Sequence, residues 1–275
     1  MSDSPEIGVT IEAAGLATNV LDSGVDPGGG TVLLIHGSGP GVSAYANWRL
    51  TIPALSERFR VIAPDIVGFG YTEHDPASYN LLGWTRHVLG VLDSLGVDSA
   101  HVVGNSFGGS LALALAIHHP QRVRRLGLMG AVGVGFDITP GLDAVWGYEP
   151  SVQAMRELLE IFTFEPNPLI DDLAELRYRA SIRPGVQEAF SGMFPAPRQA
   201  ALDRLTHADD AIASISAPTM IFHGRDDRVI PLAVSWRLLE LIPAAQLHVF
   251  GECGHWTQIE HAQAFNRILR DFLAD

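Results

Sequence analysis

Short apolar runs alternate with longer helical segments along most of this chain. Runs that are apolar nearly throughout and rich in Val, Ile and Leu are typical of strands buried on both faces of a parallel sheet. Such strands are expected at residues 31–35, 59–63, 100–103, 123–129, 218–223 and 246–250. Helices are expected between them, at residues 48–55, 79–95, 110–117, 236–241 and 262–273. This alternation predicts an α/β fold with a mostly parallel central sheet, flanking helices and right-handed crossovers.

Two parts of the chain depart from this alternation. Residues 8–20 predict two edge strands joined by a turn at Gly15. Between Pro140 and His207 no strand is predicted. Helical spacing occurs there instead, at residues 155–162 and 169–182. Proline-rich breaks interrupt it at residues 166–168 and 195–197. We therefore expect a core domain formed by residues 1–139 and 208–275, with residues 140–207 inserted as a helical lid (cap) domain.

The segment Gly104-Asn105-Ser106-Phe107-Gly108 lies between a predicted strand and a predicted helix. A Gly-x-Ser-x-Gly sequence in this context is the nucleophile elbow, a sharp turn that presents the serine Oγ above a sheet. The Phe107 amide would then lie at the helix N-terminus, where a developing oxyanion is stabilised. The structural alternative is a glycine-rich turn with a solvated serine. The predicted strand before the turn and the predicted helix after it favour the interpretation of Ser106 as a catalytic nucleophile.

A serine nucleophile requires a base, and the base requires a carboxylate that orients it. In proteins with a nucleophile elbow, the acid and then the histidine follow the serine along the chain. His255 lies in a glycine-flanked loop just after the last predicted strand, which favours it as the base. Other histidines after Ser106 are interpreted as structural or solvated, namely His118, His119, His223, His248 and His261.

The acid is expected after the strand at residues 218–223. Asp226 and Asp227 both satisfy this condition, and the residue pattern leaves the choice between them open. One of them would then have the ordinary role of an aspartate that stabilises a turn through its own backbone. Asp137, which follows the strand at 123–129, is a weaker third candidate.

A second oxyanion donor is expected in the loop His36-Gly37-Ser38-Gly39-Pro40-Gly41. This loop follows the predicted strand at 31–35, and open α/β sheets bind ligands at the carboxyl ends of their strands. Its glycine-rich backbone could offer the Ser38 amide to a substrate. A simple tight turn is the alternative for His36-Gly37, but it accounts less well for six such residues together.

Composition narrows the class of protein. The chain has 275 residues, 47% of them hydrophobic, which suffices for one large core with an inserted lid. The single cysteine, Cys253, excludes an intramolecular disulfide framework and suits a reducing compartment. The polar residues 1–12 do not resemble a signal peptide, and no apolar run reaches 18 residues. We therefore expect a cytoplasmic protein that does not bind membranes.

The formal net charge of −13 argues against nucleic acid as a partner, because phosphates require clusters of Lys and Arg. It does not exclude an anionic substrate, but such a substrate would need a local cationic contact. No cluster of His, Asp and Glu has the spacing of metal ligands, so neither a metal nor an organic cofactor is implied.

These motifs, together with Asp65-x-x-Gly68-x-Gly70 and Gly254-His255-Trp256, resemble the α/β-hydrolase fold. More narrowly, they resemble the meta-cleavage product hydrolases, and within that family the 2-hydroxymuconate semialdehyde hydrolases. The likeness runs along nearly the whole chain, including the lid segments 138–150 and 174–178. The lid likeness narrows the class, because the triad motifs alone fit many hydrolases.

The resemblance implies a role for each matching residue. Ser106 corresponds to the nucleophile, Asp227 to the acid and His255 to the base. The oxyanion amides would be those of Ser38 and Phe107. The positions that resemble the family's substrate-binding residues are Asn47, Asn105, Arg177 and Trp256.

Arg177 resembles the family's carboxylate-binding arginine, and a planar guanidinium can hold a carboxylate bidentately. Without the resemblance, a solvated helix charge would be the preferred interpretation of Arg177, since Arg179 and Arg183 lie nearby. The corresponding alternative for Trp256 is a core aromatic residue.

The activity implied is hydrolysis of a carbon–carbon bond in 2-hydroxymuconate semialdehyde and its small 6-alkyl analogues, during aromatic catabolism. A homo-oligomer, dimer or larger, is implied as well. A carboxylesterase with the same triad is the nearest rival. A ligand-binding receptor that uses a catalytically silent hydrolase fold is a rival from another class.

Overall fold

The computed structural model describes residues 4–165 and 170–274. Within them, eight strands form one sheet in the order β1-β2-β4-β3-β5-β6-β7-β8. They are β1 (Val9–Ala13), β2 (Leu16–Asp22), β3 (Thr31–Ile35), β4 (Arg60–Pro64), β5 (Ala100–Asn105), β6 (Val123–Met129), β7 (Thr219–Gly224) and β8 (Ala245–Phe250). The pairings from β4 to β8 are all parallel, whereas β1–β2 and β2–β4 are antiparallel. The predicted mostly parallel sheet is thus confirmed.

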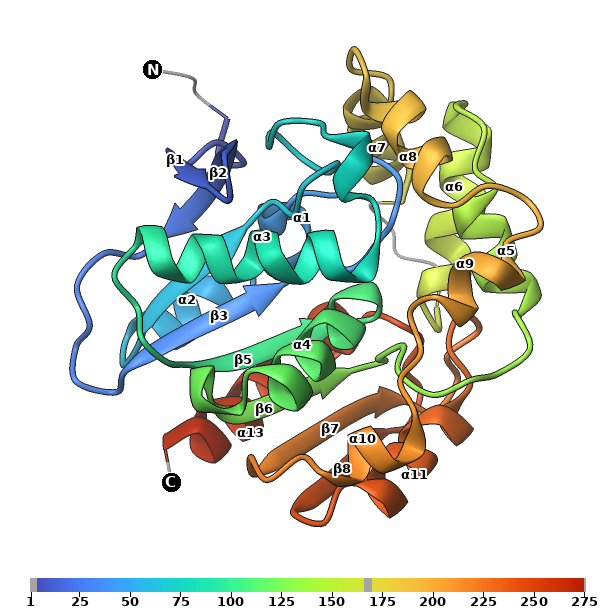
Figure 1. Cartoon of the computed structure of the whole chain (residues 1–275). Coiled ribbons are helices and arrows are strands. Elements are labelled where there is room, and N and C mark those ends of the chain that lie inside the picture. The colour runs from blue at the N-terminus through green and yellow to red at the C-terminus, as the bar shows by residue number, and fades with distance from the viewer. Residues whose placement is uncertain (1–3, 166–169, 275) are drawn as a thin grey trace.

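Helices cover both faces of this sheet (Figure 1). The core helices are α1 (Ala44–Trp48), α2 (Ile52–Ser56), α3 (Leu81–Ser94), α4 (Phe107–His118), α10 (Asp209–Ala213), α11 (Leu232–Leu241), α12 (Thr257–Glu260) and α13 (Ala262–Ala274), with 3-10 turns η1 (Pro76–Ser78) and η2 (Pro120–Arg122). Alternate residues of β3 enter different cores, because successive strand side chains point to opposite faces. Leu33 and Ile35 join the core beneath α3 and α4, while Val32 and Leu34 join the core beneath α1, α2 and α13.

The predicted strand-free segment is helical where the structure describes it. Its helices are α5 (Pro140–Trp146), α6 (Val152–Phe162), α7 (Ile170–Ser181), α8 (Val186–Met193) and α9 (Gln199–Asp203). In Figure 1 they gather beyond the carboxyl ends of the parallel strands. The expected break at 195–197 separates α8 from α9. The expected break at 166–168 and the predicted helix start at residue 169 lie outside the described residues. None of the described helices is long and apolar enough to cross a membrane.

Several predicted boundaries were wrong. The single helix expected at 48–55 is two short helices, because the Ser43 side chain caps α1 early and α2 begins separately with Pro53 in its first turn. The edge position holds for β1 but not for β2, which pairs with β4 and lies inside the sheet. The short helices α5, α8, α9, α10 and α12 were not predicted.

Candidate active site

Ser106 lies at the turn between β5 and α4 in a strained conformation. Its φ of 53° and ψ of −115° are unusual for a residue with a Cβ. Three backbone hydrogen bonds hold the turn: the Ser106 amide donates to the Met129 carbonyl at 2.9 Å, and the Ser106 carbonyl accepts from the amides of Gly109 and Val132 at 2.9 and 3.0 Å. Gly108 must be glycine, since a Cβ there would lie 2.4 Å from the Ile35 carbonyl oxygen.

His255 and Asp227 form a buried pair beside this turn. The Nδ1 of His255 lies 2.7 Å from Oδ2 of Asp227. The other oxygen, Oδ1, accepts hydrogen bonds from the backbone amides of Val229 and Ile230, at 2.7 and 3.0 Å. Burial pushes the pKa of Asp227 upward, but the neighbouring His255 and His223 outweigh burial and hold it below the usual value. The carboxylate is therefore ionised and its hydrogen-bonding capacity is used.

The other two candidate acids have different surroundings. Asp226 forms an ion pair with Arg225 at 3.2 Å. Asp137 is exposed. The structure brings neither of them to His255, while Asp227 contacts it directly.

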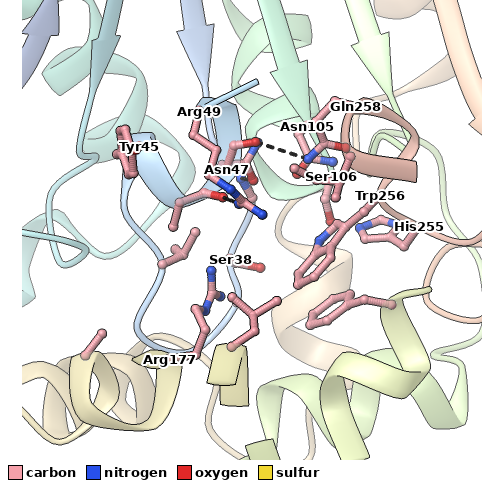
Figure 2. Close-up of a pocket in the computed structure, with 18 of the residues that line it drawn as sticks. Ser38, Tyr45, Asn47, Arg49, Asn105, Ser106, Arg177, His255, Trp256 and Gln258 are labelled. Atoms are coloured by element: carbon pink, nitrogen blue, oxygen red, sulfur yellow. Dashed lines mark hydrogen bonds between the residues drawn. The ribbon is translucent and has the colours of Figure 1, made fainter. Parts of the chain in front are cut away.

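A pocket collects most of the residues predicted for the site. Ser106 and His255 both line it, as do Ser38 and the four predicted substrate-binding residues. Those four are Asn47, Asn105, Arg177 and Trp256. In Figure 2, Arg177 of α7 reaches the pocket from the side opposite Asn105, while His255 and Trp256 lie beside Ser106.

The loop after β3 lies directly against the serine turn. A Cβ on Gly37 would lie 2.9 Å from Oδ1 of Asn105 and 3.4 Å from Cβ of Ser106. The Gly37 amide donates to Oδ1 of Asn47 at 3.2 Å. The amide of Phe107, the first residue of α4, has no acceptor within its own helix, as at every helix start. Ser38 and Phe107 thus belong to two backbone segments that meet beside Ser106.

His36 fixes the start of this loop. Its Nε2 accepts a hydrogen bond from the Ile66 amide at 2.9 Å, so Nδ1 must carry the proton that is donated to the Gly37 carbonyl at 2.7 Å. Burial lowers the pKa of His36 to about 4, so the ring is neutral at physiological pH. His36 acts on the site through the backbone, not by proton transfer.

Arg177, on α7, is buried although it carries a charge. Its guanidinium donates to the Pro40 carbonyl at 3.2 Å and lies 6.0 Å from the centre of the Trp256 ring. Burial lowers the pKa of Arg177 to about 10, which still leaves it charged at neutral pH. Within the described part of the chain, no carboxylate lies within 4 Å of it, and its Nε has no hydrogen-bond partner. The carboxylate of Glu6, which also lines the pocket, acts on Arg177 from beyond this distance, so the guanidinium has no close carboxylate partner among the described residues.

Aromatic residues close the side of the pocket next to His255. Phe162 of α6 stacks on Trp256 with ring centres 4.5 Å apart, and its ring also lies 5.9 Å from that of His255. The Phe162 carbonyl accepts the His255 amide at 2.8 Å. Residues 140–207 contain several bulky side chains, and Phe162 is the one of these that lines the described pocket; the others are Trp146, Phe164, Phe190 and Met193.

Sequence reasoning missed several residues of the site. Gln258 and Arg49 line the pocket, and Nε2 of Gln258 donates to the Asn47 carbonyl at 3.3 Å. Trp146 donates through Nε1 to Oγ of Ser38 at 2.9 Å. His223, interpreted as a structural residue, lies 3.3 Å from Oδ2 of Asp227. Only Gln258 had a local signal, because it lies two residues after Trp256, in the short helix α12 that follows the loop carrying His255.

Comparison with known proteins shows the family. The model of the α/β hydrolase fold matches residues 30–262. A 2-hydroxymuconate semialdehyde hydrolase of Pseudomonas sp. (strain CF600) is 58% identical over 274 residues, which cover 99% of this chain and 96% of that protein. A crystal structure of a variant of the meta-cleavage product hydrolase CumD superposes with a TM-score of 0.95 at 56% identity, covering 98% of each chain.

The chain belongs to the meta-cleavage product hydrolases. A further relative, a 2-hydroxy-6-oxo-2,4-heptadienoate hydrolase of Pseudomonas putida, is 56% identical over 98% of this chain and 97% of that protein. This meta-cleavage product hydrolase is accordingly an enzyme that hydrolyses a carbon–carbon bond in the degradation of aromatic compounds. The predicted fold and class of activity are confirmed.

Proposed function

We propose that this enzyme hydrolyses the C5–C6 bond of 2-hydroxymuconate semialdehyde and of its small 6-alkyl analogues. The observation that carries this proposal is the buried Arg177, which has no carboxylate partner among the described residues and lies in the same pocket as Ser106. A buried, unpaired cation is costly unless a ligand completes it. The substrate carboxylate would do so, and Asn47, Asn105 and Trp256 would hold the dienoate beside it.

The reaction would begin with a change of tautomer. The bound dienol becomes a keto form as its hydroxyl proton leaves and a proton is added at C5, with His255 as the group that moves the proton. Protonation of C5 matters because the C5–C6 bond must break with its electron pair on C5. The carbon chain then leaves as an enolate conjugated with the 2-oxo group.

Cleavage would follow by covalent catalysis. Ser106 transfers its proton to His255 and attacks the C6 carbonyl, and the Ser38 and Phe107 amides stabilise the oxyanion. Asp227 holds the imidazole and supports its charged form. Collapse breaks the C5–C6 bond, and the enolate takes the proton held by His255 and leaves as 2-hydroxypenta-2,4-dienoate, so that an acyl-enzyme remains. Neutral His255 then removes a proton from a water molecule that attacks the acyl group, and it returns this proton to Ser106 as a small carboxylic acid is released.

The C6 substituent would be small. Apolar side chains line the pocket around the reacting group, among them Leu142, Val145, Phe162 and Val229. The names of the two relatives above specify substrates with hydrogen or methyl at this position. A phenyl group would displace packed side chains, and overpacking costs roughly 1–3 kcal/mol.

The test is a comparison of kcat/KM for the 6-H, 6-methyl and 6-phenyl dienoates and for p-nitrophenyl acetate. We expect the two small dienoates to exceed the phenyl substrate by about tenfold to a hundredfold and the ester by more. Ser106→Ala should remove turnover while substrate binding persists. A phenyl substrate equal to the small ones would contradict the size assignment, and an ester that outperforms all dienoates would identify a carboxylesterase. Tight dienoate binding without turnover in the wild type would indicate a receptor.

We further propose, on family resemblance, that residues 140–207 act as a lid domain and that the enzyme is a cytoplasmic homo-oligomer. Light scattering coupled to size-exclusion chromatography measures the oligomeric state directly. A monomer at micromolar concentration would contradict that part of the proposal.

A further inference from the structure

A second histidine contacts the acid of the proposed triad. His223, at the carboxyl end of β7, is fully buried, and its Nε2 lies 3.3 Å from Oδ2 of Asp227. This is the same oxygen that contacts Nδ1 of His255. Since Oδ1 already accepts two backbone amides, the contact with His223 falls on the oxygen that orients the base.

The neighbours of His223 determine which of its nitrogens carries the proton. Nε2 also lies 3.0 Å from the carbonyl of Ile230, and a carbonyl oxygen can only accept. Nε2 therefore carries a hydrogen, which it donates to the Ile230 carbonyl while lying 3.3 Å from Oδ2 of Asp227. Nδ1 lies 2.6 Å from Oγ of Ser235, whose hydroxyl donates to it in the neutral ring. Thus Ser235 and Ile230 together hold the protonated Nε2 of the ring beside Oδ2 of Asp227.

From this geometry we propose that His223 is a positioning residue that tunes the base through Asp227. The partly positive N–H edge of its ring, 3.3 Å from Oδ2, stabilises the negative charge on that oxygen. A carboxylate stabilised in this way attracts the protonated imidazole of His255 less strongly than an isolated carboxylate would. His223 itself touches neither the substrate nor the reacting atoms.

Other titratable groups around Asp227 do not duplicate this effect. Cys253 lies nearby, but burial raises the pKa of its thiol, so it is uncharged in the working range. Asp226 is paired with Arg225. From the lid, the apolar ring of Phe162 is the group that packs against His255. Among these neighbours, the N–H of His223 is thus the group through which a substitution can alter the Asp227–His255 pair.

The decisive comparison is between His223→Met and His223→Gln. Met has a similar size and no donor, whereas the amide nitrogen of Gln can occupy the place of Nε2. We expect His223→Met to lower kcat/KM about tenfold at neutral pH, with most of the loss in kcat. The acid limb of its pH profile should move upward by about 0.5–1 pH unit, since one unit is a tenfold change in proton affinity. His223→Gln should stay within about threefold of wild type.

His207→Met is the matched control. His207 is also hydrogen-bonded, through Nε2 to the Ser110 carbonyl at 3.0 Å, but lies away from the triad. It should lose stability without a shift of the acid limb. If His223→Met does not fold, Ser235→Ala, which releases Nδ1, should move the limb in the same direction by a smaller amount. An unmoved acid limb in the folded variant overturns the proposal.

The tuning role presupposes the proposed triad, and the two can fail separately. If Asp227→Asn abolishes turnover while His223→Met leaves the acid limb in place, only the role of His223 is wrong. If Asp227→Asn is itself mild, the triad assignment is wrong, whatever His223 does.

Discussion

Adjacent residues of this enzyme can have opposite surroundings. Asp226 is partly exposed and paired with Arg225, while the carboxylate of Asp227 is buried against His255. The pKa of Asp227 is held low by the two histidines beside it, despite burial. A buried carboxylate whose lone pairs are all used is suited to orient an imidazole, and an exposed one is not.

Asp227→Asn should lower kcat for the dienoate by about 10⁴-fold, because an amide at this position no longer supports the charged imidazole and favours the wrong tautomer. Asp226→Asn, one residue away, is the matched control and should remain within about threefold. Steady-state kinetics with purified, folded variants measures both. Equal, mild losses would mean that another acid serves His255.

Arg177→Gln should reduce kcat/KM for the dienoate by about tenfold to a hundredfold, which corresponds to roughly 1.5–3 kcal/mol for a charge-assisted hydrogen bond. A neutral ester should be spared, since it has no carboxylate to bind. Arg179→Gln is the control on the same helix, because Arg179 is exposed and pairs with Glu175. Equal losses on dienoate and ester would assign Arg177 a structural role.

At the scale of elements, a side chain of α5 supports the loop after β3, in addition to the contact that Arg177 makes with Pro40. Trp146, at the end of α5, stacks on Phe194 with ring centres 4.4 Å apart and donates through Nε1 to Oγ of Ser38. The stack fixes the orientation of the indole, and the hydrogen bond from the indole then holds the Ser38 side chain in the loop after β3. The proposed lid therefore supports the site as well as covering it.

Trp146→Phe retains an aromatic stack on Phe194 but removes the donor to Ser38. We expect kcat to fall about threefold to tenfold, on the scale of one hydrogen bond of about 1 kcal/mol, with a small change in Tm. Trp236→Phe on the exposed surface is the control. A loss confined to Tm, with kcat unchanged, would show that the contact serves folding alone.

At the scale of the whole molecule, buried histidines connect stability to pH. Burial lowers the pKa of His36 and that of His87 to about 4. In both rings one nitrogen accepts a backbone amide, from Ile66 and Val67 respectively, so protonation would break a hydrogen bond. The unfolded chain, whose histidines have pKa values near 6.5, binds these protons more readily.

Stability should therefore be complete above about pH 6.5 and fall as the pH drops toward about 4, by on the order of 1–3 kcal/mol for each histidine. Urea unfolding between pH 7.5 and 4.5 measures this slope. His87→Leu should be less stable at neutral pH yet show a shallower slope. A parallel pH dependence in the variant and the wild type would mean that His87 does not contribute.

The amino-acid pattern alone determined most of the core. The bounds of β3 and β6 were predicted correctly. Each is a short apolar run with turn residues at both ends, so the ends of the run mark the ends of the strand. The turn at Ser106 was found because its strain, its glycines and its helix start are all local. The short helices α5, α8 and α9 were missed, since helices of five to eight residues depend on tertiary packing more than on their own periodicity.

What only the tertiary structure decided is which separated residues meet. Asp226 and Asp227 differ in sequence by one position, and only the path of the loop after β7 brings one of them to His255. The pattern around Arg177 favours a solvated charge, yet packing of α7 over the loop after β3 buries it in the pocket. His223 gave no signal beyond a strand residue, because its contact with Asp227 depends on the turn between them. The burial of a side chain and the way it points determine its charge state and reactivity, and both are properties of the packed chain and not of its local sequence pattern.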